Sequence, residues 1–441
     1  MKSLTLVLII IYIAGAVTLD EAIQTALSSR SDIIASRNSL QSSIWEGRAA
    51  SLWFLPRISA GLTYIHSADV QQLDIPGMGS ISMGSEYMSE AGINVDVPLY
   101  VPQAVAGSSL SGIATEMAEA SLTVSEQNAV EEVTAVFYGA LLAEELSVVA
   151  EEALSIAEEA YSVSRIKYES GMISRLDLLQ SEVAWENRKP GVIETRMAAE
   201  DARTALAFAM GLEIREVVPE GYLEEPLPLG IPASFEEAET LMRENNPDLD
   251  IASDLREMGS SQVRMARAEF MPSLLFRTSY SFQAMRDDWH FTDTDYDRDL
   301  SFMISLQIPL FDGYSDISGY KSAQMSKLTS DANAFALENA VSFSLQQAWS
   351  SLEAARERVN ATDYTLLQAE EVVEIAQVSF ETGVISQLEM DQALLALTMA
   401  RTNRAAALFS LRVAEASVLR VCGALDWYSK DNTLTQHKIQ E

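Results

Sequence analysis

The residues of this chain that could do chemistry are few and widely spaced. Three aspartates alternate in the run Asp293-x-Asp295-x-Asp297, which is how a calcium-binding loop begins. Such a loop also needs glycine at its sixth position and glutamate at its twelfth, where this chain has Arg298 and Ile304. No Ser, His and Asp set, metal-ligand cluster or phosphate-binding loop has convincing spacing. The sequence therefore predicts neither an enzyme nor a resident metal or cofactor.

The three histidines and the single cysteine suit structural roles. His66 and His290 fall at the ends of predicted hairpins, where an exposed histidine is the ordinary case. Cys422 has no second cysteine to pair with, so we expect a small buried apolar residue there.

The charge of the chain excludes one class of partner. There are 64 acidic and 30 basic residues, giving a formal net charge of −34, and no Lys or Arg occurs from residue 58 to residue 164. Phosphate binding needs a basic surface, which excludes nucleic acid as a natural partner. An acidic surface of this extent suits a solvated face or the wall of an aqueous passage.

The N-terminus predicts export. Lys2 is followed by an apolar run over residues 4–13 and by the small residues Ala14, Gly15 and Ala16. This is the pattern of a cleaved signal peptide, which we place at residues 1–16. We expect no transmembrane helix after it, so any membrane-spanning part would have to be a closed β-barrel, which leaves no strand edge unpaired in lipid.

The rest of the chain repeats itself. The matched segments are Phe54-Leu55-Pro56 with Phe270-Met271-Pro272, 216 positions apart, and Tyr168-Glu169-x-Gly171 with Phe380-Glu381-x-Gly383, 212 positions apart. A register kept over this length indicates a tandem duplication. We divide the chain into a first repeat at 17–217, a linker rich in Pro and Gly at 218–233, a second repeat at 234–425 and a polar C-terminal tail at 426–441.

Each repeat has the same order of elements. A helical segment (19–51 and 234–269) is followed by two strand-like runs around a polar loop, and these runs end at Pro98 or Pro309. A helix of nearly seventy residues comes next (103–169 and 315–381). It would be ~100 Å long at about 1.5 Å per residue.

Glycines end these long helices. Gly171 and Gly383 each form a turn, and a second helix returns to Gly211 or Gly423. Pro190 lies inside the first return helix, where we expect a kink or a short break.

The strand-like runs alternate apolar and polar side chains. In the last run the apolar members are Leu300, Phe302, Ile304 and Leu306, and the polar members are Asp299, Ser301, Ser305 and Gln307. A lipid-facing barrel strand needs this pattern, although a sheet packed on a soluble core has the same period. The export signal and the long helices favour the barrel, with strands at 57–66, 87–97, 273–284 and about 295–308.

Several acidic residues fall at the polar positions of this alternation, on the face that would line the inside of a barrel. This predicts an acidic lumen. They are Glu90, Asp96, Asp293, Asp295, Asp297 and Asp299. Arg298 has the opposite parity and should point outward. Water-filled rings of acidic side chains favour cations.

Four strands cannot close a barrel, since the smallest barrels use about eight. Subunits must therefore combine, and cyclic symmetry is the ordinary solution. A trimer would supply twelve strands.

These features together resemble the TolC-like outer membrane efflux protein family, also called outer membrane factors. The resemblance covers about residues 17–425 and is carried by the duplication, by the run Ile308-Pro309-Leu310-Phe311-Asp312-Gly313 and by the turns at 168–171 and 380–383. It implies a mainly α fold with membrane β. Duplicated helical hairpins would form a periplasmic α-barrel, and four strands per chain would contribute to a 12-stranded trimeric outer-membrane β-barrel.

The resemblance also implies partners and a location. The protein would be a homotrimer in the outer membrane of a Gram-negative-type cell, in contact with outer-membrane lipid and with a long periplasmic extension. A periplasmic adaptor (membrane fusion) protein and an inner-membrane pump would complete a tripartite efflux or type I secretion system. The chain would perform no chemistry of its own.

A gate at the helix tips, opened by the adaptor, is a further implication of the resemblance. The family's entrance acid corresponds to Glu389, with Asp391 close by and Asp177 at the first-repeat position. A basic latch and a further acid of the family are replaced by Ile385 and Gln392, so our candidate latch donor is Arg175, at the tip of the first repeat. The same acids would also serve as helix caps, because acids are favoured near helix N-termini.

A periplasmic coiled-coil adaptor or scaffold without a membrane barrel is the competing hypothesis. Such a protein would need neither alternating strands nor the duplication. We therefore expect an outer-membrane exit duct.

Overall fold

The computed structural model describes residues 16–70, 72–77, 79–82, 84–213, 217–228, 230–290 and 296–425. The chain forms two compact units, one from residues 1–39, 119–251 and 336–441 and one from residues 40–118 and 252–335. Each unit therefore takes segments from both sequence repeats. The C-terminal tail and all but the last residue of the expected signal peptide lie outside the described residues.

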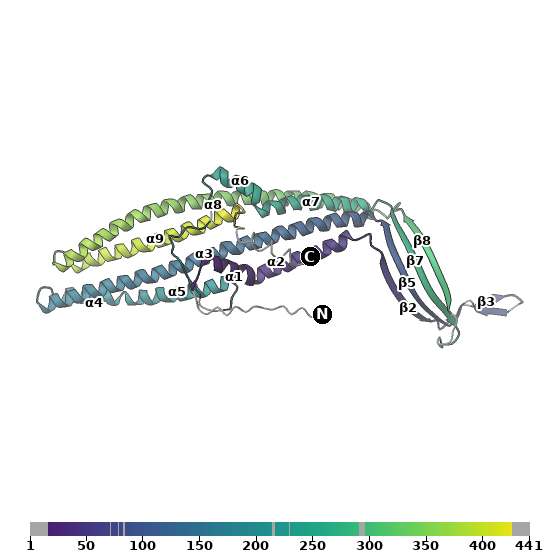
Figure 1. The fold of residues 1–441 in the computed structure, drawn as a ribbon, viewed down its shortest axis with the longest axis horizontal. Coiled ribbons are helices and arrows are strands. Elements are labelled where there is room, and N and C mark those ends of the chain that lie inside the picture. The colour runs from purple at the N-terminus through teal and green to yellow at the C-terminus, as the bar shows by residue number, and fades with distance from the viewer. Residues whose placement is uncertain are drawn as a thin grey trace. The chain divides into compact units, whose positions relative to one another are not determined.

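The helices follow the order that the duplication predicts (Figure 1). In the first repeat they are α1 (Leu19–Ser29), α2 (Ser31–Ser51), α3 (Pro102–Glu169), α4 (Arg175–Glu186) and α5 (Lys189–Ala209). In the second they are α6 (Phe235–Asn245), α7 (Pro247–Ala268), α8 (Ser315–Glu381) and α9 (Gln387–Val421). The predicted long helices are confirmed, since α3 and α8 run unbroken for 68 and 67 residues. The opening segments are each broken once, which the sequence did not predict.

The first return helix is interrupted near its proline, as expected. α4 ends at Glu186 and α5 begins at Lys189, so Pro190 stands in the first turn of α5, where its missing N–H is not needed. The equivalent helix α9 has no proline there and is continuous over 35 residues.

Gly211 and Gly423 show why each return helix ends in glycine. Both have positive φ, +73° and +68°, which closes a helix C-terminus. A Cβ on Gly211 would lie 2.9 Å from the backbone of Arg30, and one on Gly423 would lie 2.2 Å from the carbonyl oxygen of Asn245. Each glycine thus packs against the break in the opening helical segment of its own repeat.

Side-chain hydrogen bonds also connect each break to the end of the return helix that packs on it. The Arg30 guanidinium donates to the carbonyl of Ala209 at 3.1 Å, and the Asn246 amide donates to the carbonyl of Val421 at 2.7 Å. Each break residue therefore caps the last turn of the return helix, whose final carbonyls have no partner within the helix.

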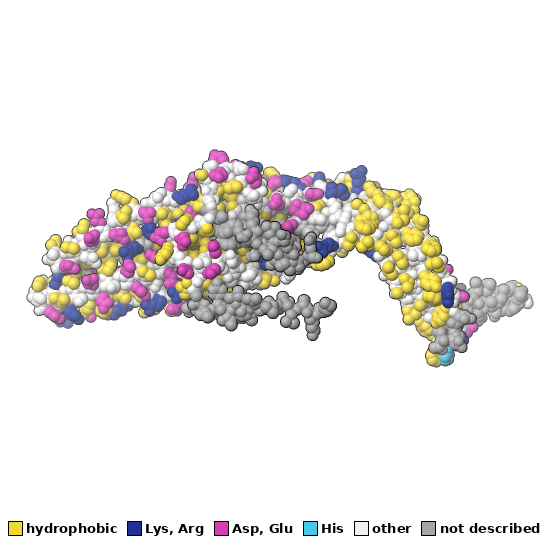
Figure 2. Space-filling view, viewed as in Figure 1, with side chains coloured by type: hydrophobic (Ala, Val, Ile, Leu, Met, Phe, Trp, Pro, Cys, Tyr) yellow, Lys and Arg dark blue, Asp and Glu magenta, His cyan; other side chains and the backbone are white. Residues whose placement is uncertain are grey.

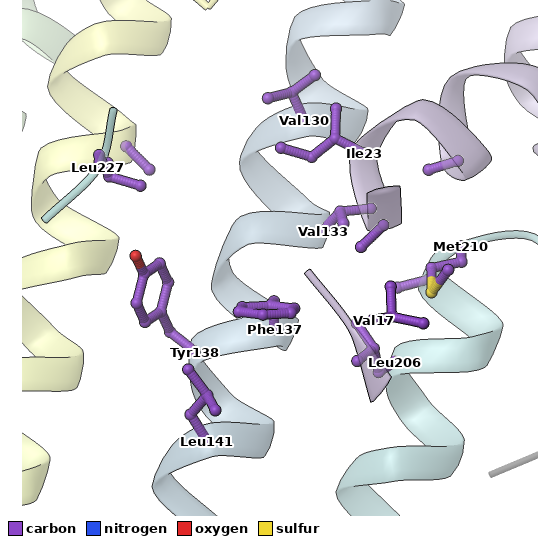
Figure 3. Close-up of a cluster of buried hydrophobic side chains, with 14 of the residues drawn as sticks. Val17, Ile23, Val130, Val133, Phe137, Tyr138, Leu141, Leu206, Met210 and Leu227 are labelled. Atoms are coloured by element: carbon purple, nitrogen blue, oxygen red, sulfur yellow. The ribbon is translucent and has the colours of Figure 1, made fainter. Parts of the chain in front are cut away.

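The main core cluster of the first unit lies where α3 meets α1, α5 and α9 (Figure 3). Val133 and Phe137 of α3, Ile23 of α1 and Leu206 of α5 belong to it, and none is more than 2% exposed. Burying an aliphatic or aromatic side chain of this size contributes about 1.5–3 kcal/mol. The core therefore holds helices from different parts of the chain in register.

The segment expected to be a linker is packed into the same core. Leu223 and Leu227 are each 5% exposed and join the cluster. Arg412 of α9, 6% exposed, donates to the carbonyls of Leu223 and Glu224 and forms an ion pair with Glu415 at 2.7 Å. The linker is thus part of the folded unit.

The second unit is built on a four-stranded antiparallel sheet in the order β2-β5-β7-β8. Its strands are β2 (Arg57–His66), β5 (Tyr87–Tyr100), β7 (Ser273–Arg286) and β8 (Asp297–Gln307). The four predicted strands are confirmed, and the two hairpins join through β5 and β7. Figure 2 shows hydrophobic side chains over most of the visible face of this sheet.

The remaining strands are short: β1 (Ala16–Val17) with β6 (Val218–Pro219), and β3 (Gln72–Ile75) with β4 (Gly79–Ser82). The β3–β4 pair occupies the expected polar loop of the first hairpin. The expectation that the second strand ends at Pro98 was wrong. β5 continues to Tyr100 with a register shift, because a bulge accommodates a residue that cannot donate to the ladder.

The sequence analysis expected no transmembrane helix after the signal peptide. One described helix, α3, is nevertheless long and apolar enough to cross a membrane by length and composition alone. α3 contains an 18-residue window of mean hydropathy 1.6, and 44% of that window is buried inside the protein. Its apolar side chains include Val133 and Phe137 of the core cluster. Core packing thus accounts for part of the hydropathy of this helix.

Candidate functional sites: the helix tips and the polar sheet face

The two helix tips are built alike. Gly171 and Gly383 have φ of +73° and +77°, and the N–H of the following residue, Met172 or Val384, donates back across the helix end at 2.8 Å. These are the bonds of a Schellman motif. No described atom lies within 4 Å of a Cβ built on either glycine, so the positive φ alone requires glycine.

Two of the predicted gate acids cap the helices that follow the tips. Ser174 donates through its N–H and its hydroxyl to Asp177 at 3.1 and 2.8 Å, and Ser386 donates likewise to Glu389 at 2.7 and 2.9 Å. Both are capping boxes. Hydrogen bonds from the N–H and then the hydroxyl of Ser386 hold the pKa of Glu389 below its usual 4.5. Both acids therefore have a structural role at the tips.

Asp391 lies apart from the caps, in a polar cluster that joins the two hairpins. Gln387 of α9 donates to Asp391 at 3.0 Å, and Ser164 of α3 donates to Gln387 at 3.3 Å. Burial raises the pKa of Asp391, while the hydrogen bond from Gln387 and the charge of Arg188 partly oppose that rise. Arg188 stands in the break between α4 and α5. The interruption near Pro190 thus brings a cation to the cluster.

Lys167 makes a tip contact that the sequence analysis missed. Its amine, in the last turn of α3, donates to the carbonyl of Phe380 near the end of α8 and lies 4.4 Å from the centre of the Phe380 ring. Lys167 and Arg165 are the first basic residues after the stretch 58–164. The sequence could have indicated this contact of Lys167, because a cation in the last turn of a helix often binds the unpaired carbonyls of a helix end.

The remaining residues that the sequence analysis named at the tips take no part in these polar contacts. Arg175 is exposed and makes no hydrogen bond or ion pair with any residue that the structure describes. Ile385 packs against the apolar cluster that contains Phe380. Gln392 is exposed. Among the described residues of one chain, the polar tip contacts between the hairpins are therefore those of Lys167 and the Asp391 cluster, beside the apolar cluster that contains Phe380.

The polar face of the sheet carries the described members of the predicted acidic set. Residues paired across neighbouring strands share a face. The register pairs Glu90 with Gln283 and Gln283 with Asp297, and it pairs Ser281 with Asp299. Asp293 and Asp295 lie outside the described residues.

The charges on this face are unevenly balanced. Asp96 is paired by register with both Arg57 and Arg277, and the Arg277 guanidinium donates to its carboxylate. Glu90 has Thr63 and Gln283 beside it, so its row has no basic residue. Glu90, Asp297 and Asp299 therefore supply the unbalanced negative charge.

The opposite face is apolar, as the alternation predicts. One register row runs from Ile58 through Val95 and Thr278 to Phe302. Arg298 lies on this face beside Phe282, with its guanidinium 5.9 Å from the ring centre. Arg298 therefore has the parity of the apolar residues, as the alternation predicts; that this face points outward stays a prediction.

The residues considered for chemistry form no reactive site in the part of the chain that the structure describes. No group of three or more His, Cys, Asp or Glu side chains there could hold a metal ion. Cys422 is buried, its thiol donates to the carbonyl of Ala238 at 3.5 Å, and burial raises its pKa to about 11. The thiol is therefore protonated and has the expected structural role.

Two tandem helical hairpins and an amphipathic sheet with two open edges define the subunit of an outer-membrane channel. The chain belongs to the outer membrane efflux protein family, whose model matches residues 22–212 and 240–424, one stretch in each repeat. Its expected outer-membrane location and its function as an exit duct follow from that membership. The family consists of channels rather than enzymes.

Solved structures show the same fold. The structure of CusC has a TM-score of 0.76 at 17% identity and covers 92% of both chains. The outer-membrane channel CmeC of Campylobacter jejuni has a TM-score of 0.77 at 15% identity, covering 92% of this chain and 85% of that one. The open state of the MtrE outer-membrane channel of Neisseria gonorrhoeae has a TM-score of 0.74 at 17% identity, covering 92% and 89%. No curated protein matches in sequence.

Proposed function

We propose that three copies of this chain form a passive exit duct of a tripartite efflux or type I secretion system. The twelve strands close into a barrel in the outer membrane, and the helical hairpins form a tunnel in the periplasm. The tips hold the tunnel shut until a periplasmic adaptor, linked to an inner-membrane pump, opens it. Energy comes from that pump.

The observation that supports assembly is the four-stranded sheet with two free edges. Among the residues that the structure describes, β2 and β8 each pair on one side only, and nearly all their side chains are exposed. Unpaired strand edges are not tolerated in lipid, and four strands are too few to close. Pairing β8 of one subunit with β2 of the next satisfies both edges and keeps the apolar face outward.

The observations that support a gate are the contacts between hairpins at the tips. Lys167 ties α3 to the end of α8, and the chain from Ser164 through Gln387 to Asp391 ties α3 to α9. Opening the tunnel would require the hairpins to separate, which breaks these bonds. The acids Asp177, Glu389 and Asp391 and the cation Arg175 then line or flank the entrance.

The polar sheet face supports a cation-preferring lumen. In a trimer Glu90, Asp297 and Asp299 each become a ring of three carboxylates without basic neighbours in their register rows. Asp293 and Asp295 would extend this set. Screening at physiological salt acts over about 8 Å, so the rings select ions where the passage is narrow.

Fractionation and planar-bilayer recording test this function. The protein should be recovered from outer membranes as a trimer that dissociates on heating in detergent, and it should conduct with low open probability. Lys167→Met should raise the open probability. The control Lys321→Met, which changes a lysine bonded to Gln324 of its own helix, should not. Recovery as a soluble periplasmic monomer, or absence of conductance, would refute the exit duct.

A further inference from the structure

The basic residues on the apolar face of the four-stranded sheet gather at one end of it. Strand parity puts Arg286 of β7 and Arg298 of β8 on this face, together with His66 of β2. All three lie where the strands meet the loops, at the end that does not connect to α2, α3, α7 or α8. Figure 2 shows basic and histidine side chains at this end of the sheet. The acids of the four strands all lie on the polar face; they are Glu90, Asp96, Asp297 and Asp299.

Aromatic rings lie beside these basic residues. One register row of the apolar face runs from His66 through Tyr87 to Arg286. The His66 ring stacks on Tyr87 with the ring centres 4.4 Å apart, and the Tyr64 ring lies 6.3 Å from Tyr87. The five residues Tyr64, His66, Tyr87, Arg286 and Arg298 are called the distal rim below. Rings with an apolar body and a polar tip suit the boundary between lipid and water.

The distal rim has one cation that no acid of the described chain neutralises. Arg286 pairs with Asp288 at 3.0 Å, and His66 lies 4.0 Å from Glu86. Arg298 is exposed, stands over the Phe282 ring and forms no ion pair with any residue that the structure describes. An arginine on a lipid-facing surface requires an anionic partner or water, and the headgroup layer of the membrane supplies both.

The position of Arg298 along β8 fits the border of the hydrocarbon layer. The apolar alternation of this strand runs from Arg298 to Ile308, ten residues further on. Ten residues extend about 34 Å along a strand, which is about 25 Å across a bilayer at a tilt of about 40°. This equals the usual height of the apolar band of a membrane barrel. Arg298 therefore stands at the level of the headgroup phosphates.

The rim continues beyond that level. Arg298 is paired by register with Phe282, and Arg286 lies four residues further along β7. Four residues extend about 14 Å, a longer distance than one phosphate group occupies. The rings of Tyr64, His66 and Tyr87 lie on the same face over this distance, and sugar rings pack their C–H groups against such aromatic faces.

We propose that the distal rim binds the phosphorylated sugar headgroup of a glycolipid in the outer leaflet of the outer membrane. Arg298 holds a phosphate, because the guanidinium fork matches the oxygens of a phosphate. The three rings pack against the sugar, and Arg286 bounds the site on its distal side. This inference rests on the proposed barrel, because it requires the apolar face to meet lipid.

Lipid titration of the full-length trimer tests the site. Trimers freed of bound lipid in detergent are titrated with diphosphoryl lipid A, and binding is followed by native mass spectrometry and by the temperature at which the trimer dissociates. Arg298→Gln should bind about tenfold more weakly, the loss expected for one hydrogen bond between charged groups. Arg298→Lys should retain most of the binding. Arg57→Gln is the matched control, because it removes the same charge from the polar face of the same sheet and should leave binding unchanged.

A second variant tests the rings without changing any charge. Tyr87→Val removes the ring that stacks on His66 and keeps a residue that suits a strand, so it should also weaken binding of lipid A. Both rim variants should conduct in planar bilayers like the wild type, which separates loss of lipid binding from loss of the channel.

Two further ligands distinguish the glycolipid from other sources of phosphate. Phosphatidylglycerol carries a phosphate without a sugar ring and should bind at least tenfold more weakly than lipid A. Inorganic phosphate at the same concentration should not compete. The inference is overturned if either ligand matches lipid A, if Arg298→Gln or Tyr87→Val binds lipid A as tightly as the wild type, or if Arg57→Gln weakens binding equally. A wild-type chain that forms no trimer and does not conduct would instead refute the proposed function.

Discussion

The four glycines at the helix ends allow a steric contact to be separated from a backbone preference. Gly171, Gly211, Gly383 and Gly423 have nearly the same φ, between +68° and +77°. Alanine at any of them must adopt a left-handed conformation, which costs roughly 1–2 kcal/mol. The surroundings differ, so a series of Gly→Ala variants should not be uniform.

The surroundings of each glycine give the order in which the four Gly→Ala variants should lose stability. At Gly171 and Gly383 no described atom lies within 4 Å of the new Cβ, so only the backbone cost applies, about 1–2 kcal/mol. At Gly211 the nearest backbone atoms are 2.9 Å away, and at Gly423 the nearest is 2.2 Å away, against 3.4 Å for ordinary contact. Backbone cannot rotate aside, and overpacking of this kind adds about 1–3 kcal/mol or more. Gly423→Ala should be the most damaging variant, at about 2–5 kcal/mol in total.

Urea unfolding followed by circular dichroism in detergent checks the order, together with the amount of protein recovered from outer membranes. The unfolding midpoint should fall least for Gly171→Ala and Gly383→Ala, more for Gly211→Ala and most for Gly423→Ala. A Gly423→Ala variant as stable as Gly383→Ala would show that the joint with α6 and α7 is not close-packed, and the reasoning would fail.

Three further predictions concern other parts of the chain. The raised pKa of Asp391 means that the closed seam binds a proton more tightly than a solvated carboxyl does, so closure should strengthen as pH falls from neutral toward 3.8. Asp391→Asn should abolish this pH dependence of the bilayer current and give the acid-like closure already at neutral pH; an unchanged profile would remove Asp391 from the gate. Arg412→Met should cost about 3–5 kcal/mol because it leaves Glu415 buried and unpaired, whereas Arg412→Met with Glu415→Met should cost less. Limited proteolysis of the linker 218–233 would show this order, and equal cleavage of the two variants would contradict it. Neutralising Glu90, Asp297 and Asp299 should shift the reversal potential in a salt gradient toward lower cation preference. Asp96→Asn should shift it less, because arginines flank Asp96 on both sides. Anion preference in the wild type would refute the acidic lumen.

Local features of the sequence were sufficient for the elements and their order. Helix ends at Gly171 and Gly383 follow from the backbone freedom of glycine, and the break near Pro190 follows from its missing N–H. The four strands follow from a period of two that one face of a sheet imposes. The duplication added the expectation that both halves share these features.

Contacts between distant residues were not accessible in the same way. The break at Asn246 has a local cause, because Pro247 disfavours a helical conformation of the residue before it. The sequence could not show that a glycine and a carbonyl of the return helix pack on each break, more than 170 residues away along the chain. Lys167 meets Phe380 only because α3 and α8 end beside each other. No periodicity of a single helix reveals which side of it faces a particular neighbour.

The candidate site illustrates the same division. The sequence alone determined that acids gather near the tips and that strand parity puts Glu90, Asp96, Asp297 and Asp299 on one face, because spacing fixes both. The caps formed by Asp177 and Glu389 are local contacts, and the sequence had already given capping as one of the roles of these acids. Only the tertiary structure decided that Asp391 joins two hairpins and that Asp96 is neutralised by Arg277. Those outcomes depend on burial and on which charges become neighbours, and both are set by packing between segments that the sequence does not place side by side.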